Sequence, residues 1–166
     1  MNLGLSDKLK IAFPNTIPVI RPLVNLNEIR NPHWLAGFVD GEGCFSNLVI
    51  KKPGLDEIKT IVLEFKVTQH TRDNKLLESL VKYLDCGNIY YIKGINALDF
   101  KVRAFKDIDE KIIPFFIYYP LHGVKLLNYF DFVKAAEIIQ TKGHLTEKGL
   151  SDILLFKGKM NSLRSY

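Results

Sequence analysis

An acidic pair bracketed by glycines stands out in residues 34–45, which read Trp-Leu-Ala-Gly-Phe-Val-Asp-Gly-Glu-Gly-Cys-Phe. Gly37 and Gly41 each cost a helix about 1 kcal/mol relative to Ala, so both make sense if another backbone must approach that face closely. Asp40 and Glu42 fall where such a helix would end. Carboxylates bind divalent cations, so the pair is a candidate metal site. The chemistry alone favours the alternative, which is a solvated acid in a glycine turn.

The elements around this pair follow from capping residues and periodicity. Asn31 and Pro32 predict a helix start, because Asn is a good N-cap and Pro suits the first helical position; this helix runs to about Gly41. Alternation of apolar and polar residues predicts strands, and apolar stripes predict further helices. The predicted strands cover residues 44–52, 60–69, 86–93 and 97–103, and the predicted helices cover 73–84, 107–118, 124–140 and 146–157.

This order, helix-strand-strand-helix-strand-strand-helix followed by further helices, predicts an α+β fold. Two hairpins would form one four-stranded antiparallel sheet with helices on one face. The other face would carry polar and partly cationic side chains, which suits a DNA-reading platform. The alternative is the ordinary solvated face of a half-buried sheet.

The first thirty residues predict an arm, and residues 31–166 a single domain. A short helix from Leu5 to Ala12, capped by Ser6, precedes an extended path enforced by Pro14, Pro18 and Pro22. Residues 1–30 are therefore interpreted as a linker-like segment.

Composition narrows the class of protein. The 166 residues are 47% hydrophobic and 25% charged, as in a soluble globular domain. The 23 Lys and Arg against 18 Asp and Glu favour a polyanionic partner, although a mildly basic enzyme surface fits equally well. Two cysteines, Cys44 and Cys86, make neither a disulfide framework nor a zinc site. No apolar run reaches the ~20 residues of a bilayer span, and no secretion signal is evident, so we expect no membrane partner.

Residues Leu35 to Gly43, read as Leu-Ala-Gly-Phe-Val-Asp-Gly-Glu-Gly, resemble the LAGLIDADG motif of homing endonucleases. The chain resembles the C-terminal half of a two-motif enzyme from fungal organelles, and the likeness covers nearly its whole length. It includes the stretch from Leu121 to Lys125, the segment His144-Leu145-Thr146, and the linker-like arm. The resemblance implies a sequence-specific, metal-dependent DNA endonuclease that makes double-strand breaks in a long site.

The resemblance also implies roles for individual residues. Glu42 would be a catalytic metal ligand, and the carbonyl of Gly41 would add a second oxygen ligand, with Mg²⁺ as the cofactor and Ca²⁺ or Mn²⁺ as substitutes. Asp40 would have a structural role near the helix end. Gln69, at the end of the second strand, would order the water near the metals. Lys106, after the fourth strand, would polarise solvent or steady phosphate charge.

The outward side chains of the four predicted strands are the candidate DNA contacts. Strand residues in the major groove read base edges, and Lys and Arg contact phosphates. The first strand departs from this pattern, because Leu48 and Ile50 would be apolar on the DNA face and Asn47 would face the core. Either the register shifts there or the contacts are van der Waals. The candidates are Ser46, Leu48, Ile50, Lys52, Thr60, Val62, Glu64, Lys66, Thr68, Asn88, Tyr90, Asp99, Lys101 and Arg103.

A single motif supplies a single Glu42, and no second copy is found at half-length. We therefore expect a homodimer whose motif helices meet at a two-fold axis and which favours a near-palindromic site. The expected interface comprises Leu35, Ala36, Gly37, Val39, Asp40 and Gly41.

Three alternatives remain open. The chain could need a different, complementary half for activity, it could be a binding-only half-domain, or it could be an intron maturase that binds intron RNA on the same fold. The resemblance further implies a mitochondrial or other organellar location, while the target sequence, the host and any maturase activity are not readable from these residues.

Overall fold

The computed structural model describes residues 6–17, 28–55 and 57–164. A helical arm segment comes first, and a helix, two hairpins and a series of helices follow it. The described helices are α1 (Asp7–Ala12), α2 (Pro32–Glu42), α3 (Asn74–Leu84), α4 (Phe105–Asp107), α5 (Ile113–Tyr118), α6 (Lys125–Gln140) and α7 (Glu147–Lys157), with 3-10 turns at Thr71–Asp73, Gly143–Leu145 and Asn161–Leu163 and a π-helical turn at Ile108–Ile112. The strands are β1 (Gly43–Lys51), β2 (Ile58–His70), β3 (Asn88–Tyr91) and β4 (Ala97–Val102).

The four strands form one antiparallel sheet in the order β1-β2-β4-β3, so the two hairpins join through β2 and β4. Phe45 pairs with Phe65, Val67 pairs with Phe100, and Phe100 pairs with Ile89. These residues occupy the same side of successive strands, because side chains alternate along a strand. The predicted α+β fold with a four-stranded antiparallel sheet is confirmed.

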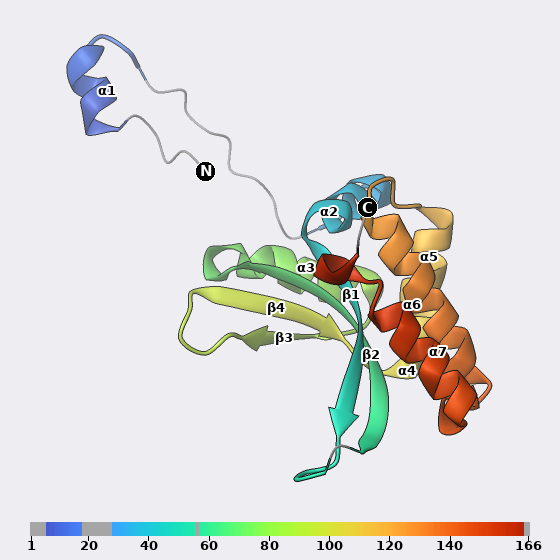
Figure 1. Cartoon of the computed structure of the whole chain (residues 1–166). Coiled ribbons are helices and arrows are strands. Elements are labelled where there is room, and N and C mark those ends of the chain that lie inside the picture. Colours follow the sequence, from blue (N-terminus) through green and yellow to red (C-terminus); the bar gives the residue numbers. More distant parts are fainter. Residues whose placement is uncertain (1–5, 18–27, 56, 165–166) are drawn as a thin grey trace.

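Helices cover one side of this sheet, with α6 and α7 beside β1 and α3 beside β4 (Figure 1). The core between the layers is rich in aromatic rings. The ring of Phe45 lies 5.1 Å from that of Phe65, 5.5 Å from that of Phe116 and 5.3 Å from that of Phe132, measured between centroids. All four side chains are fully buried, so β1, β2, α5 and α6 share one core.

The motif helix begins and ends for reasons visible in its sequence. The side chain of Asn31 accepts a hydrogen bond from the backbone N–H of His33 at 2.9 Å, and Pro32 occupies the first turn, as predicted. The helix continues through Glu42, one residue further than predicted. In the arm, Ser6 caps α1 as predicted, while residues 1–5 and 18–27, with Pro18 and Pro22, lie outside the described residues.

Two elements differ from the prediction for identifiable reasons. Strand β3 begins at Asn88 and not at Cys86, because Gly87 has φ +81° and a Cβ there would lie 2.5 Å from the Phe100 ring. The helical stretch predicted from residue 107 begins at Phe105 and widens into the π-helical turn before α5. Pro114 accounts for the widening, because it has no N–H for the carbonyl four residues earlier.

The strand alternation is confirmed, including its unusual part. Asn47 faces the core at 1% exposure, while Leu48 is half-buried and Ile50 exposed on the other side. The register shifts only between Ile50 and Lys51, so the alternative of a shifted first strand is wrong for Ser46, Leu48 and Ile50. Lys52 lies beyond the end of β1, where it pairs with Glu57. Among the described helices, none has the length and apolar composition of a membrane span.

Candidate functional site

The end of α2 projects Glu42 away from the core. Glu42 is the last residue of the helix and is exposed, and β1 starts at the next residue, Gly43. A Cβ on Gly43 would lie 2.5 Å from the Val39 side chain, so only glycine lets the strand leave the helix this tightly. The local sequence therefore fixes Glu42 at the junction of helix and sheet.

The carboxylate of Asp40 binds the backbone of the loop before α6. Its Oδ2 accepts hydrogen bonds from the backbone N–H groups of His122, at 3.0 Å, and Gly123, at 2.8 Å. Gly123 comes so close that a Cβ there would lie 3.0 Å from the Asp40 carboxylate. Asp40 thus ties the loop before α6 to the motif helix, and it faces its own chain instead of the expected dimer interface.

Lys125, the first residue of α6, lies at the same junction. Its Nζ donates to the carbonyl of Gly41 at 3.1 Å and to the carbonyl of Gly43. Burial lowers the pKa of Lys125, and the nearby carboxylates of Asp40 and Glu42 offset part of this effect because they favour the charged ammonium. Sequence reasoning noticed the Leu121–Lys125 stretch as family-like but gave Lys125 no role, because only the fold brings it to the motif.

The strand register separates Gln69 from Lys106. Gly43 pairs with Val67 and Leu98 pairs with Gln69, so Gln69 lies at the Glu42 end of the sheet, on the strand side that carries Val67. Strand β4 then runs away from that end, and Val102 is already roughly 13 Å along it from Leu98 at ~3.3 Å per residue. Lys106 lies beyond Val102, exposed and 4.0 Å from Glu110. The register therefore leads the chain toward Lys106 away from the junction of α2 and β1, whereas Lys125 lies at that junction.

The donor set for a divalent cation is incomplete within one chain. Glu42 offers a carboxylate and Gly41 a carbonyl, but Lys125 donates to that carbonyl. No three His, Cys, Asp or Glu side chains gather into a metal cluster within the described ranges. Mg²⁺ takes six oxygen ligands and often uses only one or two carboxylates, with water and phosphate oxygens for the rest. Glu42 and Gly41 therefore fit part of such a site.

The open face of the sheet carries the candidate DNA contacts, but two of its acids are buried by ion pairs. Arg103 binds Glu64 through its Nε at 2.6 Å and its Nη2 at 2.5 Å, and Glu64 is only 5% exposed. Lys101 pairs with Asp99 at 2.8 Å. Glu64 and Asp99 therefore act as partners for cations of the face, a role that their outward register alone did not indicate.

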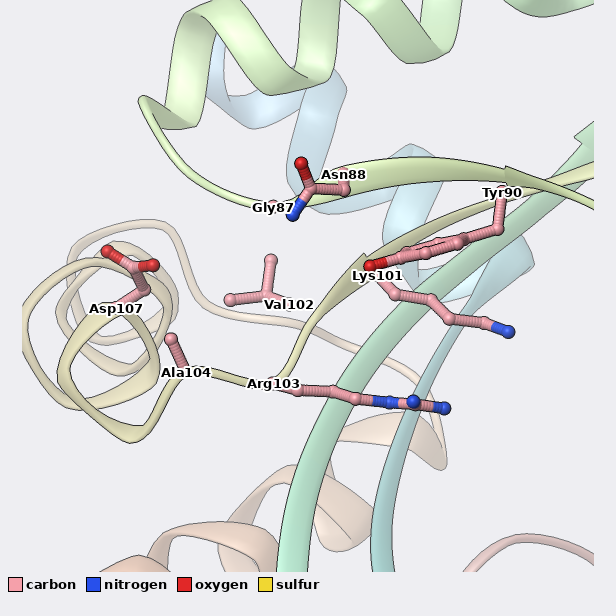
Figure 2. A pocket seen from close by; sticks show the side chains of 8 residues that line it. All are labelled: Gly87, Asn88, Tyr90, Lys101, Val102, Arg103, Ala104 and Asp107. Atoms are coloured by element: carbon pink, nitrogen blue, oxygen red, sulfur yellow. The ribbon is translucent and has the colours of Figure 1, made fainter.

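The pair around Asp99 is part of a small polar network. The hydroxyl of Thr68 donates to Asp99 at 2.6 Å, and the Nζ of Lys101 lies 5.6 Å from the centre of the Tyr90 ring. Burial raises the pKa of Asp99, but the hydrogen bonds from Lys101 and Thr68 outweigh it, so the pKa lies below its usual value. Figure 2 shows the side chains of Lys101, in β4, and Arg103, just after it, extending in the same direction beside a hollow lined also by Asn88, Tyr90 and Asp107.

The remaining candidates on this face vary in exposure. Ile50, Lys52, Thr60, Asn88, Tyr90 and Arg103 are exposed, and Ser46, Leu48, Val62, Lys66, Thr68 and Lys101 are half-buried.

The outer face of α2 presents glycines to open space. A Cβ added to Gly37 or to Gly41 would meet nothing within 4 Å, and both residues are exposed. Trp34 and Phe38, one helical turn apart on the same side, stack at 5.2 Å between ring centroids. By contrast, Leu35, Ala36 and Val39 are buried in this chain, so the prediction that their side chains form an interface with a second chain is wrong. The face left for a partner is therefore built on Gly37 and Gly41.

Comparison with known proteins identifies the family. The model of the LAGLIDADG endonuclease family matches residues 35–136, which begin at the motif and include α6 up to Ala136. The chain belongs to the LAGLIDADG endonuclease family.

Individual relatives of this family match the chain over most of its length. "Probable intron-encoded endonuclease 3" of Neurospora crassa is 35% identical over 96% of the chain. The "uncharacterized cox1 intron-2 37.2 kDa protein" of Schizosaccharomyces pombe is 34% identical over 78% of it. The LAGLIDADG homing endonuclease I-SmaMI, solved bound to cleaved DNA, is 44% identical and superposes on 99% of the chain with a TM-score of 0.86.

The chain spans only part of these LAGLIDADG proteins. It covers 30% of the Neurospora protein, 38% of the Schizosaccharomyces protein and 55% of the I-SmaMI chain. Other structures of I-SmaMI hold an uncleaved DNA target with calcium ions or carry lysine-to-alanine substitutions.

Proposed function

We propose that this chain forms half of a sequence-specific, divalent-metal-dependent DNA endonuclease of the homing type, which makes double-strand breaks. The observation that carries the proposal is the junction of α2 and β1, where Glu42 is exposed at the end of the helix. The outer face of this helix presents Gly37 and Gly41, with open space beside both. Next to the junction lie the ammonium of Lys125 and, by strand register, Gln69. Family membership and the likeness to I-SmaMI bound to cleaved DNA support the same reaction.

The residues at the junction have complementary roles in this proposal. Glu42, with the carbonyl of Gly41, would hold a divalent cation, for which Mg²⁺ is the expected ion; when bound, the cation supplies an activated water and neutralises phosphate charge. The ammonium of Lys125 would contact a phosphate oxygen and stabilise negative charge that develops there. Gln69 would hydrogen-bond the attacking water.

The DNA would lie on the open face of the sheet. Arg103 and Lys101 offer cationic contacts to phosphates, and Thr68, Asn88 and Ser46 offer hydrogen bonds to base edges. Because one chain supplies one Glu42, a second motif helix must complete the site. We propose a homodimer on a near-palindromic target, with a complementary half as the alternative partner.

Cleavage of a randomised duplex library in Mg²⁺ tests the function and yields the target in one experiment. Once the target is known, Glu42→Gln should lower the cleavage rate at least 1,000-fold and leave DNA affinity within about threefold, because a neutral amide of the same shape is a poor metal ligand. Lys106→Gln is the matched control and should cleave normally, because Lys106 lies away from the junction. Cleavage by Glu42→Gln at the native rate would refute this site.

An RNA arm of the same experiment addresses splicing. If the chain binds intron RNA more tightly than duplex DNA and cleaves no DNA, the maturase alternative is favoured. Relatives named after the cox1 and ND4 introns support an organellar, mitochondrial location for the product.

A further inference from the structure

Two sets of hydrogen bonds attach the loop before α6 and the start of α6 to the end of the motif helix. Asp40 Oδ2 accepts the N–H groups of His122 and Gly123, and Lys125 Nζ donates to the carbonyls of Gly41 and Gly43. The lysine thus bridges the last turn of α2 and the first residue of β1. Its acceptors there are main-chain oxygens, and it forms no salt bridge with a carboxylate of the described residues.

The Gly41 carbonyl attracts any cation. The last four carbonyls of a helix lack partners within the helix, and the partial negative charge of the helix dipole collects there. Glu42 adds a full negative charge at the next residue. An ammonium binds an oxygen at about 3 Å and Mg²⁺ binds at about 2.1 Å, so the two cations approach the same oxygen and repel each other there.

We propose that the Lys125 ammonium is a placeholder for the divalent cation: it occupies the Gly41 carbonyl in the metal-free chain and leaves that oxygen when the cation binds. This inference rests on the proposed function, since it takes Glu42 and Gly41 as cation ligands. The exchange keeps a positive charge at the carboxylate-bearing end of α2 in both states. It also releases the lysine only once the cation has arrived, when its ammonium becomes available to a phosphate.

An ordinary structural clamp makes the opposite prediction. If Lys125 only held α2 against β1 and did not compete with the cation, its removal would loosen Glu42 and Gly41 and weaken cation binding or leave it unchanged. The sign of the change in metal affinity therefore separates the two roles without any measurement of cleavage.

The sign of the change in metal affinity can be measured by titrating the full chain with Mn²⁺ in the absence of DNA. Electron paramagnetic resonance detects the Mn²⁺ that remains free. Lys125→Met keeps the length of the side chain and removes its charge, so we expect Mn²⁺ to bind about tenfold more tightly than to the unaltered chain. Lys134→Met is the matched control: this lysine is on the same helix but pairs with Asp131, and its loss should leave the affinity unchanged. Lys125→Met combined with Glu42→Gln should lose the gain.

Unchanged or weaker Mn²⁺ binding by Lys125→Met overturns the proposal, as does the absence of binding by both proteins at 20 mM Mn²⁺. Side-chain ¹⁵N spectra of lysine-labelled unaltered chain provide a test that needs no variant. Saturating Mg²⁺ should shift the Lys125 Nζ resonance and speed exchange of its protons with water, and an unaltered resonance at saturation also overturns the proposal. If the unaltered chain cleaves DNA but Lys125→Met binds Mn²⁺ no more tightly, the placeholder role alone is refuted. If Lys125→Met binds Mn²⁺ more tightly but the unaltered chain never cleaves DNA, only the endonuclease function is refuted.

Discussion

Glu64 is a buried acid of the open face, and Arg103 is its ion-pair partner. Both bonds from Arg103 reach its Oε2, and Glu64 is almost fully buried, while about half of the Arg103 side chain is exposed. Removing one member of such a pair leaves a buried carboxylate without its charged donor, and that loss costs more than the pair itself contributes.

Arg103→Ala should therefore lower the free energy of unfolding by about 2 kcal/mol, as measured by urea denaturation. Combining it with Glu64→Gln should recover part of the loss, because a neutral amide is less costly to bury unpaired. Lys106→Ala, which removes an exposed lysine, is the comparison variant and should change stability by less than about 0.5 kcal/mol. A loss that small in Arg103→Ala would mean that water replaces the guanidinium.

Single residues were predictable from sequence where the local pattern defines them. The glycines and the acids around Glu42 lie within one short segment, so their type and order indicate a helix end. The position of Asn47 was equally predictable, since it lies two residues from Phe45 and shares its side of the strand. The side-chain amide of Asn47 has no hydrogen-bond partner among the described residues. No sequence pattern predicted this lack of a partner.

At the scale of elements, the attachment of the α6 loop to α2 decides the geometry of the motif. Asp40 provides one oxygen for two backbone N–H groups, and both donors lie in the loop before α6. A hydrogen bond to a charged acceptor contributes about 1.5–3 kcal/mol, and the exposure of His122 and Gly123 lowers that figure because water can partly replace the carboxylate. The loop should therefore depend on this carboxylate.

Asp40→Ala should lower the free energy of unfolding by about 1.5 kcal/mol, because both N–H groups lose their acceptor. Asp40→Asn keeps an oxygen in the same place and should retain most of the stability. Urea denaturation of the two variants, with amide hydrogen exchange at His122 and Gly123, measures the effect. Equal stability and unchanged exchange protection in Asp40→Ala would show that other groups hold the loop.

Elements were predictable where periodicity or capping specifies them, and contacts between distant elements were not. The caps Ser6 and Asn31 lie at helix starts as expected, and Thr146, the expected first residue of the last helix, is its N-cap. Lys106 was chosen because it follows the fourth strand, but the antiparallel register carries that end of β4 away from the motif. Lys125 reaches the motif from a helix that the sequence places far along the chain, so only the packing of α6 against β1 could reveal it.

At the scale of the whole molecule, the exposed face of α2 is the feature that most needs a partner. Gly37 and Gly41 leave an open strip beside the stacked rings of Trp34 and Phe38. Two such helices could approach closely and bring two Glu42 side chains together, whereas bulky residues would keep them apart. The buried side of the same helix, with Leu35 and Val39, supports the monomer instead.

This division of faces allows association to be tested without harming the fold. Gly37→Leu should weaken self-association at least tenfold in analytical ultracentrifugation, because the leucine blocks the close approach of a second helix. The monomer should be no less stable, since a Cβ at Gly37 meets nothing within 4 Å and leucine favours a helix over glycine by about 0.8 kcal/mol. Lys134→Leu places the same side chain on α6 and should leave association unchanged. Undiminished association of Gly37→Leu would rule out this face as the interface, and a strictly monomeric unaltered chain would favour a complementary half over a second copy.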